Sequence, residues 1–228
     1  MEIKNTWSTI IMEYELTEQR ALSRLDQYIL FYWLISLVIG IPLLGDWLKS
    51  WNVPATLANP WFVVFLLASF AFSQVLYVLV ARHDGRPFLW GPTVIFSIGN
   101  GVIETFAFAI VYRIGAWIGD GIAMQFWPNL VEPLGFAIGF TAFVIYGGVI
   151  HGMFWLQYLP PHLDDSPQSM RIRKLRPLAE MALVLGWSLC FYLYQDIWTV
   201  IFIHILVDLG LMLRVRPPVF LGASRRIA

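Results

Sequence analysis

The run Thr93-Val-Ile-Phe-Ser-Ile-Gly-Asn-Gly-Val-Ile-Glu-Thr-Phe-Ala-Phe-Ala-Ile-Val-Tyr112 is long and apolar enough to cross a bilayer, yet it carries a carboxylate near its centre. An acidic side chain at the middle of a spanning helix costs roughly 2.5 to 3.5 kcal/mol on insertion scales. Glu104 therefore needs polar partners inside the protein. Asn100 and Gly101 lie on the same helix face as Glu104, so this face should point away from lipid.

The composition of the whole chain is that of an integral membrane protein. Hydrophobic residues make up 58% of the 228 residues and charged residues 13%, with a mean hydropathy of +0.67, whereas a soluble domain is about 25% charged. The formal net charge is zero, so nothing indicates nucleic acid as a partner. The single Cys190 cannot form an intrachain disulfide, and we interpret it as a small buried hydrophobic residue.

Six apolar runs of bilayer length are separated by proline, glycine and polar breaks, which predicts an all-α polytopic membrane protein with six transmembrane helices. The predicted spans are 28–44, 61–81, 93–112, 134–157, 178–194 and 197–213. Little polar sequence lies between them, so we expect one membrane domain over residues 27–213. Residues 1–26 are expected to form a leader and residues 214–228 a basic tail.

The distribution of Lys and Arg predicts the orientation of these spans. If the N-terminus is cytoplasmic, thirteen of the fifteen Lys and Arg fall in cytoplasmic segments, and only Lys49 and Arg113 lie outside. Cytoplasmic segments of membrane proteins carry an excess of these residues. The leader, the tail and the loop 160–177 are therefore predicted to be cytoplasmic, with both termini inside. The expected location is a plasma or other inner membrane.

His151, His204 and Asp208 also lie inside predicted spans, and counting from the cytoplasmic span ends places His151 and His204 at a depth similar to that of Glu104. His151 follows Gly147 and Gly148, which should let a neighbouring helix approach closely. His204 and Asp208 have i, i+4 spacing and share one helix face. We therefore expect the helices that carry Glu104, His151 and His204 to pack together.

The residue types at this depth are compatible with two kinds of hydrolytic site. A desolvated carboxylate can act as a general base towards water, and imidazoles can assist it or stabilise an oxyanion. Alternatively, Glu104, His151 and His204 could hold a divalent metal such as zinc, with an open position for water. The spacing of these residues does not choose between the two.

Three segments carry a resemblance to a known family. They are Asn100-Gly-Val-Ile-Glu-Thr-Phe-Ala-Phe108, the helix of His151, and His204-Ile-Leu-Val-Asp208. Together they resemble the three motifs of the CAAX-protease and bacteriocin-processing (CPBP, or Abi) family of intramembrane proteases, over residues 93–213. Glu104 matches the first Glu of Glu-Glu-x-x-x-Arg. His151 matches the His of Phe-x-x-x-His, and His204 with Asp208 matches His-x-x-x-Asn or Asp.

This resemblance implies a metalloprotease-like membrane hydrolase in which Glu104 activates water, with His151, His204 and Asp208 completing the catalytic site. Its substrate would be a membrane-associated or prenylated peptide or protein. The chain departs from the motifs at Thr105, where a second Glu is expected, at Ala109 in place of the Arg, and at Gly147 in place of the Phe.

These departures keep other functions open. The first is a non-catalytic membrane scaffold or assembly factor that retains the fold and binds a membrane protein partner. The second is a small transporter or proton relay, although the sequence shows no internal repeat of interrupted spans. A water-accessible pocket shared by Glu104 and both histidines would favour an enzyme over either alternative.

Asp208 and the polar loop after Pro160 also have other interpretations. Asp208 could pair with Arg214 near the cytoplasmic edge instead of joining the site. A loop metal site formed by His162, Asp164 and Asp165 is the other possibility, but Asp-Asp-Ser-Pro is typical turn chemistry.

Overall fold

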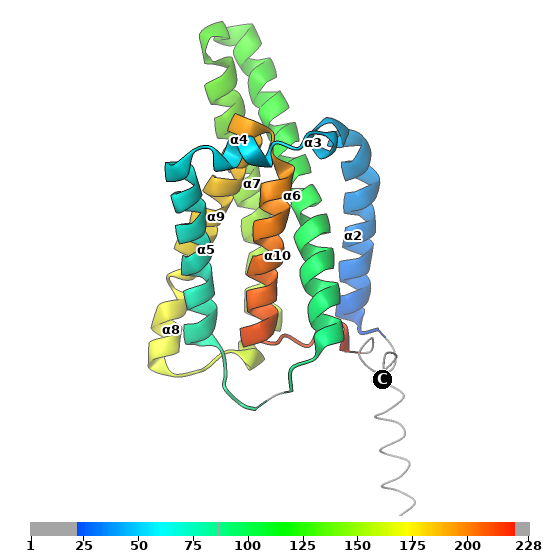
Figure 1. Cartoon of the computed structure of the whole chain (residues 1–228), viewed down its shortest axis with the longest axis vertical. Coiled ribbons are helices and arrows are strands. Elements are labelled where there is room, and N and C mark those ends of the chain that lie inside the picture. Colours follow the sequence, from blue (N-terminus) through cyan, green and yellow to red (C-terminus); the bar gives the residue numbers. More distant parts are fainter. Residues whose placement is uncertain (1–21, 86, 222–228) are drawn as a thin grey trace, which may run out of the picture.

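The computed structural model describes residues 22–85 and 87–221, and in these residues the chain forms a bundle of α-helices (Figure 1). Within these residues, six helical segments are long and apolar enough to cross a membrane, which confirms the predicted fold class and the number of spans. The long helices are α2 (Arg24–Leu43), α5 (Pro60–Val80), α6 (Trp90–Phe126), α7 (Val131–Met153), α9 (Arg176–Leu189) and α10 (Ile197–Arg214).

Short helices connect or extend the long ones. They are α3 (Gly45–Lys49), α4 (Val53–Leu57), α8 (Pro167–Arg173), the 3₁₀ turns η1 (Pro128–Leu130) and η3 (Pro160–His162), and the π-helical turns η2 (Phe154–Tyr158) and η4 (Cys190–Tyr194). The turns η2 and η4 continue α7 and α9, respectively. A short two-stranded contact between Ala81 and Leu163 joins the chain after α5 to the chain before α8.

Polar side chains fix where two of the long helices begin, α2 and α10. Ser23 and Asp26 form a reciprocal capping box at the start of α2. Gln195 adopts the left-handed conformation at the turn after η4, with φ of 50°. Asp196 then caps α10 by accepting from the backbone N–H groups of Trp198 and Thr199, each at 3.1 Å.

In the described residues, the segments that the charge count assigns to opposite sides of the membrane lie at opposite ends of the bundle. The start of α2, the end of α10, the α5–α6 connection and α8 lie at one end, whereas α3 and α4 lie at the other (Figure 1). At that second end the guanidinium of Arg113 donates to Asp46 at 2.5 and 2.8 Å. This hydrogen bond lowers the pKa of Asp46. Which end faces the cytoplasm stays a prediction from the charge count.

Helix α6 differs from the predicted third span because it continues beyond Tyr112 to Phe126, and with α7 it projects past the rest of the bundle (Figure 1). Glycines make this hairpin possible. A Cβ on Gly115 would lie 2.9 Å from the Cα of Gly139, and one on Gly119 would lie 2.8 Å from the Cα of Gly135. The two backbones therefore pack directly against each other, which stabilises the extension of α6.

The expected close approach at Gly147 and Gly148 is not found. A Cβ on Gly147 would meet ring atoms alone, those of Phe143 at 3.6 Å and of Phe108 at 4.0 Å, and one on Gly148 would meet nothing within 4 Å. The close contact of α6 with α10 occurs instead at Gly101, where a Cβ would lie 2.7 Å from the backbone N of Ile205. Small residues permit close packing only where a partner helix crosses them, and the sequence did not show which helices cross.

The segment after α10 packs against the bundle, at least as far as the structure describes it. Phe220 is 2% exposed, stacks on Trp33 at 5.5 Å between ring centroids, and donates its backbone N–H to Asp26 at 2.8 Å. The described residues that follow α10 therefore pack against α2. The leader residues 1–21 and the tail residues 222–228 lie outside the described part of the chain.

Candidate functional site

Glu104 is buried on α6 beside an amide that fixes its position. Asn100, one helical turn earlier, donates through Nδ2 to Glu104 Oε2 at 2.5 Å and to Asp208 Oδ2 at 3.0 Å. The indole N–H of Trp33 donates to the other end of this amide, at 3.2 Å from Asn100 Oδ1. Because the indole can only donate, it fixes the orientation in which the amide donors face the two carboxylates.

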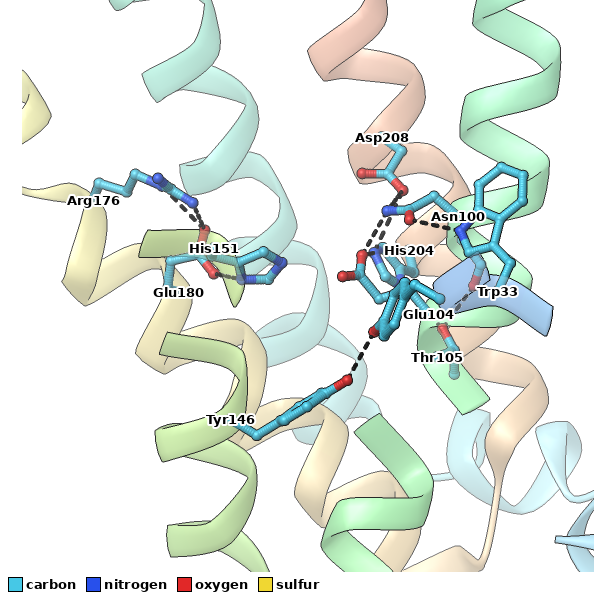
Figure 2. Close-up of polar contacts among 12 residues, drawn as sticks. Trp33, Asn100, Glu104, Thr105, Tyr146, His151, Arg176, Glu180, His204 and Asp208 are labelled. Carbon is cyan, nitrogen blue, oxygen red and sulfur yellow. Dashed lines mark hydrogen bonds and ion pairs between the residues drawn. The ribbon is translucent and has the colours of Figure 1, made fainter. Parts of the chain in front are cut away.

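Helix α10 brings His204 and Asp208 to this group, as the i, i+4 spacing predicted. His204 Nε2 lies 3.5 Å from Glu104 Oε2 and 3.4 Å from Asp208 Oδ2. His204 is 2% exposed and Asp208 5% exposed, so the four polar side chains form one buried cluster (Figure 2). We refer to Asn100, Glu104, His204 and Asp208 as the α6–α10 cluster.

The imidazole of His204 is held in place from three sides. Thr105 Oγ1 donates to the carbonyl of Gly101 at 2.6 Å and lies 3.0 Å from His204 Nδ1. Since the single hydroxyl proton goes to the carbonyl, the threonine oxygen accepts from an N–H at Nδ1. The rings of Phe108 and Trp187 pack on the imidazole with centroid distances of 5.7 and 4.8 Å. Nε2 therefore points at the two carboxylates.

Thr105 occupies the position at which the family motif has its second Glu. Its role in the structure is to orient His204, which the sequence comparison with that motif could not reveal. The difference arises because a threonine in a helix bonds the carbonyl four residues earlier and leaves its oxygen free to accept from a neighbouring helix.

Within the described residues, the donor atoms of Glu104, His204 and Asp208 lie close enough together to hold a metal ion, all within 4.8 Å of one another. Two carboxylates and an imidazole form a donor set that suits zinc or a similar cation. The set expected from the sequence contained His151 in place of Asp208, and His151 is not a member of this group.

His151 belongs to a second polar group, on the other side of the same cavity. Its Nδ1 lies 2.6 Å from Glu180 Oε2, and Glu180 Oε1 accepts from Arg176 Nε at 3.1 Å and from Nη2 at 2.6 Å (Figure 2). We refer to His151, Arg176 and Glu180 as the α7–α9 cluster. Phe108 lies between the two clusters, since its ring is 5.6 Å from that of His151 and 5.7 Å from that of His204.

A cavity of about 370 Å³ connects the two clusters. Its wall includes Glu104, His204 and Asp208 on one side and His151, Arg176 and Glu180 on the other, and most of the remaining lining is apolar or aromatic. Tyr32, which also lines the cavity, accepts a hydrogen bond from the hydroxyl of Tyr146 at 3.1 Å. All four residues predicted for the site therefore line one space, although only three are in mutual contact.

Sequence reasoning missed Glu180 and Arg176. Glu180 lies three residues into the predicted span 178–194, so it had the same signal as Glu104, an acidic residue in an apolar run. Arg176 stands four residues earlier, at the spacing of a helical ion pair. The charge pattern places this arginine in the cytoplasmic loop 160–177 and gives no role to Glu180, the carboxylate that it binds.

The contacts of Asp208 place it in the α6–α10 cluster, and those of the loop carboxylates include the turn contact expected of Asp-Asp-Ser-Pro. Asp208 contacts Asn100 and His204. In the loop before α8, Asp165 forms ion pairs with Arg82 and, at 3.6 Å, with Arg173, while Asp164 accepts from Ser166. The serine hydroxyl lowers the pKa of Asp164. These loop carboxylates are thus engaged with protein donors.

No protein-family model, curated protein or solved structure matches this chain. The resemblance to the CPBP family therefore rests on the three sequence segments alone. What the fold and the site define together is a class: over residues 22–85 and 87–221, an all-α protein with six candidate membrane spans and two polar clusters facing one internal cavity.

Proposed function

We propose that this chain is an intramembrane endopeptidase of the CPBP type, which hydrolyses a peptide bond at or in the membrane. The observation that carries the proposal is a buried carboxylate, Glu104, paired with His204 on a cavity that also contains His151. A buried, hydrogen-bonded carboxylate beside a space of about 370 Å³ has room for a water molecule and for part of a peptide.

In this proposal Glu104 is the general base that removes a proton from water. Asn100 holds the carboxylate, and Thr105 holds His204 with Nε2 towards the carboxylates. With a second proton on Nε2, His204 would stabilise the negative charge that develops on the carbonyl oxygen of the substrate, and Asp208 positions His204 and Asn100. Preorganised donors of this kind act strongly because they need no rearrangement during the reaction.

A membrane-associated or prenylated peptide is the substrate class that we propose. Apolar residues such as Leu25, Ile29 and Phe96 line the cavity, and its rim includes Tyr28 on α2 and Met153 on α7, which are 66% and 44% exposed. In a bilayer these exposed side chains would face lipid, so an apolar substrate segment could reach the cavity without crossing water.

A second form of the proposal contains a divalent metal such as zinc. Glu104, His204 and Asp208 would hold it, and the ion would supply a Lewis acid and an acidic bound water. The metal-free form is supported by Asn100, whose amide already donates to both carboxylates. Metal analysis of the purified protein distinguishes the two forms, because the second requires about one equivalent of metal and loses its activity on chelation.

The experiment that tests the proposal compares wild type with Glu104→Gln on a library of prenylated or membrane-tethered peptides. The substitution keeps the size of the side chain but removes its basicity. Loss of a general base should lower the turnover number by roughly 10²- to 10⁴-fold while insertion and folding survive. Glu132→Gln is the matched control, since Glu132 is an exposed carboxylate on α7 and does not line the cavity.

A Glu104→Gln protein that inserts normally and retains full turnover would overturn the role of this residue. If the wild-type protein shows no turnover and the Glu104→Gln variant still performs the function of the protein in cells, the alternative of a membrane scaffold or assembly factor is selected.

A further inference from the structure

Two carboxylate–imidazole pairs face each other across the cavity. On the first wall Glu104 meets His204 between α6 and α10, and on the second wall Glu180 meets His151 between α7 and α9. In Figure 2 the ring of His151 lies on the side of Glu180 that faces the α6–α10 cluster. A substrate bond that enters this cavity would therefore lie between the two pairs.

The second pair is arranged to hold one nitrogen of His151 towards the cavity. Arg176 binds Glu180 Oε1 through two donors, which leaves Oε2 for His151 Nδ1 at 2.6 Å. The guanidinium is itself fixed, because it lies 3.6 Å above the ring of Trp155. A proton on Nδ1 would complete this ion pair, because a carboxylate can only accept, and Nε2 would then be the nitrogen available to a substrate.

The two pairs have different surroundings. The carboxylate of Glu104 receives the amide of Asn100 and faces a second carboxylate, Asp208, across His204. Glu180 instead receives a permanently charged guanidinium and one imidazole. The first wall thus gathers groups that can accept a proton, whereas the second places a positively charged group behind an imidazole. Such a division is what an acid and a base need when they act on the same bond.

We propose that His151 is the general acid of the reaction and that Glu180 and Arg176 are its positioning residues. This inference rests on the proposed function. Glu104 takes one proton from water, and the hydroxide oxygen forms a bond to the carbonyl carbon. His151 starts the step as an imidazolium, with Nδ1–H towards Glu180. The carbon–nitrogen bond then breaks as its Nε2–H passes to the leaving amine. The proton on Glu104 returns to His151, directly or through water, so the enzyme is regenerated and one water is consumed.

This assignment makes a prediction that depends on the leaving group. An amine leaves a tetrahedral intermediate only when its nitrogen is protonated, whereas nitrophenolate leaves without a proton. Loss of the acid should therefore slow hydrolysis of an amide far more than hydrolysis of a matched ester. A residue with only a structural role would affect both substrates alike.

The test uses a peptide cleaved in the library and its analogue with a p-nitrophenyl ester at the scissile bond. For Glu180→Gln and for His151→Gln we expect kcat/KM for the amide to fall roughly 10²-fold and that for the ester to fall less than tenfold. Glu104→Gln should lose both activities, because both substrates need the activated water. Arg176→Lys keeps the charge but not the two-donor contact, and we expect a smaller loss confined to the amide.

Rates are divided by the fraction of folded protein, which is measured for each variant by size-exclusion chromatography and thermal melting in detergent. Glu132→Gln should leave both rates unchanged. Equal losses on amide and ester, after this correction, would overturn the role of His151 as the acid and leave the hydrolase proposal standing. A wild-type protein that cleaves neither substrate would remove the proposed function and this inference together.

Discussion

At the scale of single residues, the site depends on side chains that orient other side chains. Glu104 and His204 could carry the chemistry, but Asn100, Thr105 and Trp33 determine where their polar atoms point. A buried polar group that loses its partner costs about 1 to 3 kcal/mol, so these orienting contacts also stabilise the fold.

Thr105 provides a direct test of this arrangement. Thr105→Val keeps the shape of the side chain but leaves His204 Nδ1 without an acceptor, so we expect the free energy of unfolding to fall by about 1 to 3 kcal/mol. Thr105→Ser, which retains the hydroxyl, should restore most of this stability. The measurement is thermal or denaturant unfolding in detergent.

Thr141→Val is the matched control. Thr141 makes the same hydrogen bond to the carbonyl four residues earlier, at 2.7 Å from Ala137 O, but it is exposed on α7. A stability loss of the same size in both variants would mean that the contact between Thr105 and His204 contributes little.

At the scale of helices, the contact between α6 and α10 creates the α6–α10 cluster. These two helices are the most enclosed of the six candidate spans, with 56% of each apolar window buried, against 22% for α2. Their contact is close because Gly101 lies against the backbone of Ile205, the residue after His204. The geometry of the cluster therefore depends on the absence of a side chain at one position.

Gly101→Ala should separate the two helices. The added Cβ would lie 2.7 Å from the N and the Cα of Ile205, and backbone atoms in a helix cannot turn away as a flexible side chain can. We expect a loss of stability of roughly 1 to 3 kcal/mol, as for other overpacked interiors, together with loss of any hydrolytic activity. Unfolding and peptide cleavage are measured side by side.

Gly121→Ala is the control on the same helix, since a Cβ there meets nothing within 4 Å. Alanine has the higher helix propensity, so this control should be neutral or stabilised by up to about 1 kcal/mol. Normal stability of Gly101→Ala would contradict the close contact between α6 and α10.

At the scale of the whole molecule, the prediction that remains is orientation. The described ends of the chain and α8 lie at one end of the bundle, and the pair of Asp46 and Arg113 lies at the other (Figure 1). The first end carries most of the Lys and Arg, so we expect it to be cytoplasmic.

Cysteine labelling of intact cells tests this orientation. In a background without Cys190, a cysteine at Ala55 on α4 should react with an impermeant maleimide from outside. A cysteine at Gln168 on α8 should react only after permeabilisation. Both positions are exposed in the structure. Labelling of Gln168→Cys in intact cells would reverse the predicted topology.

The sequence alone determined the class of the fold. Six apolar runs between breakers fix six helical spans, because a backbone in lipid must satisfy its hydrogen bonds within each segment. It also placed Glu104, His204 and Asp208 in one site, together with His151. The 3.6-residue period puts His204 and Asp208 on one face, and the cost of an ion in lipid requires Glu104 to find partners.

Only the tertiary structure decided which helices cross, and with them the partners of each polar residue. The period of a helix shows which residues share a face but not which neighbour that face meets. His151 was therefore expected beside Glu104 but pairs with Glu180, and Gly101 rather than Gly147 is the residue at which two backbones approach. For the same reason the sequence placed Arg176 in a loop and showed Thr105 only as a departure from the Glu of the motif. In the structure Arg176 holds the carboxylate of Glu180 behind His151, and Thr105 holds the ring of His204.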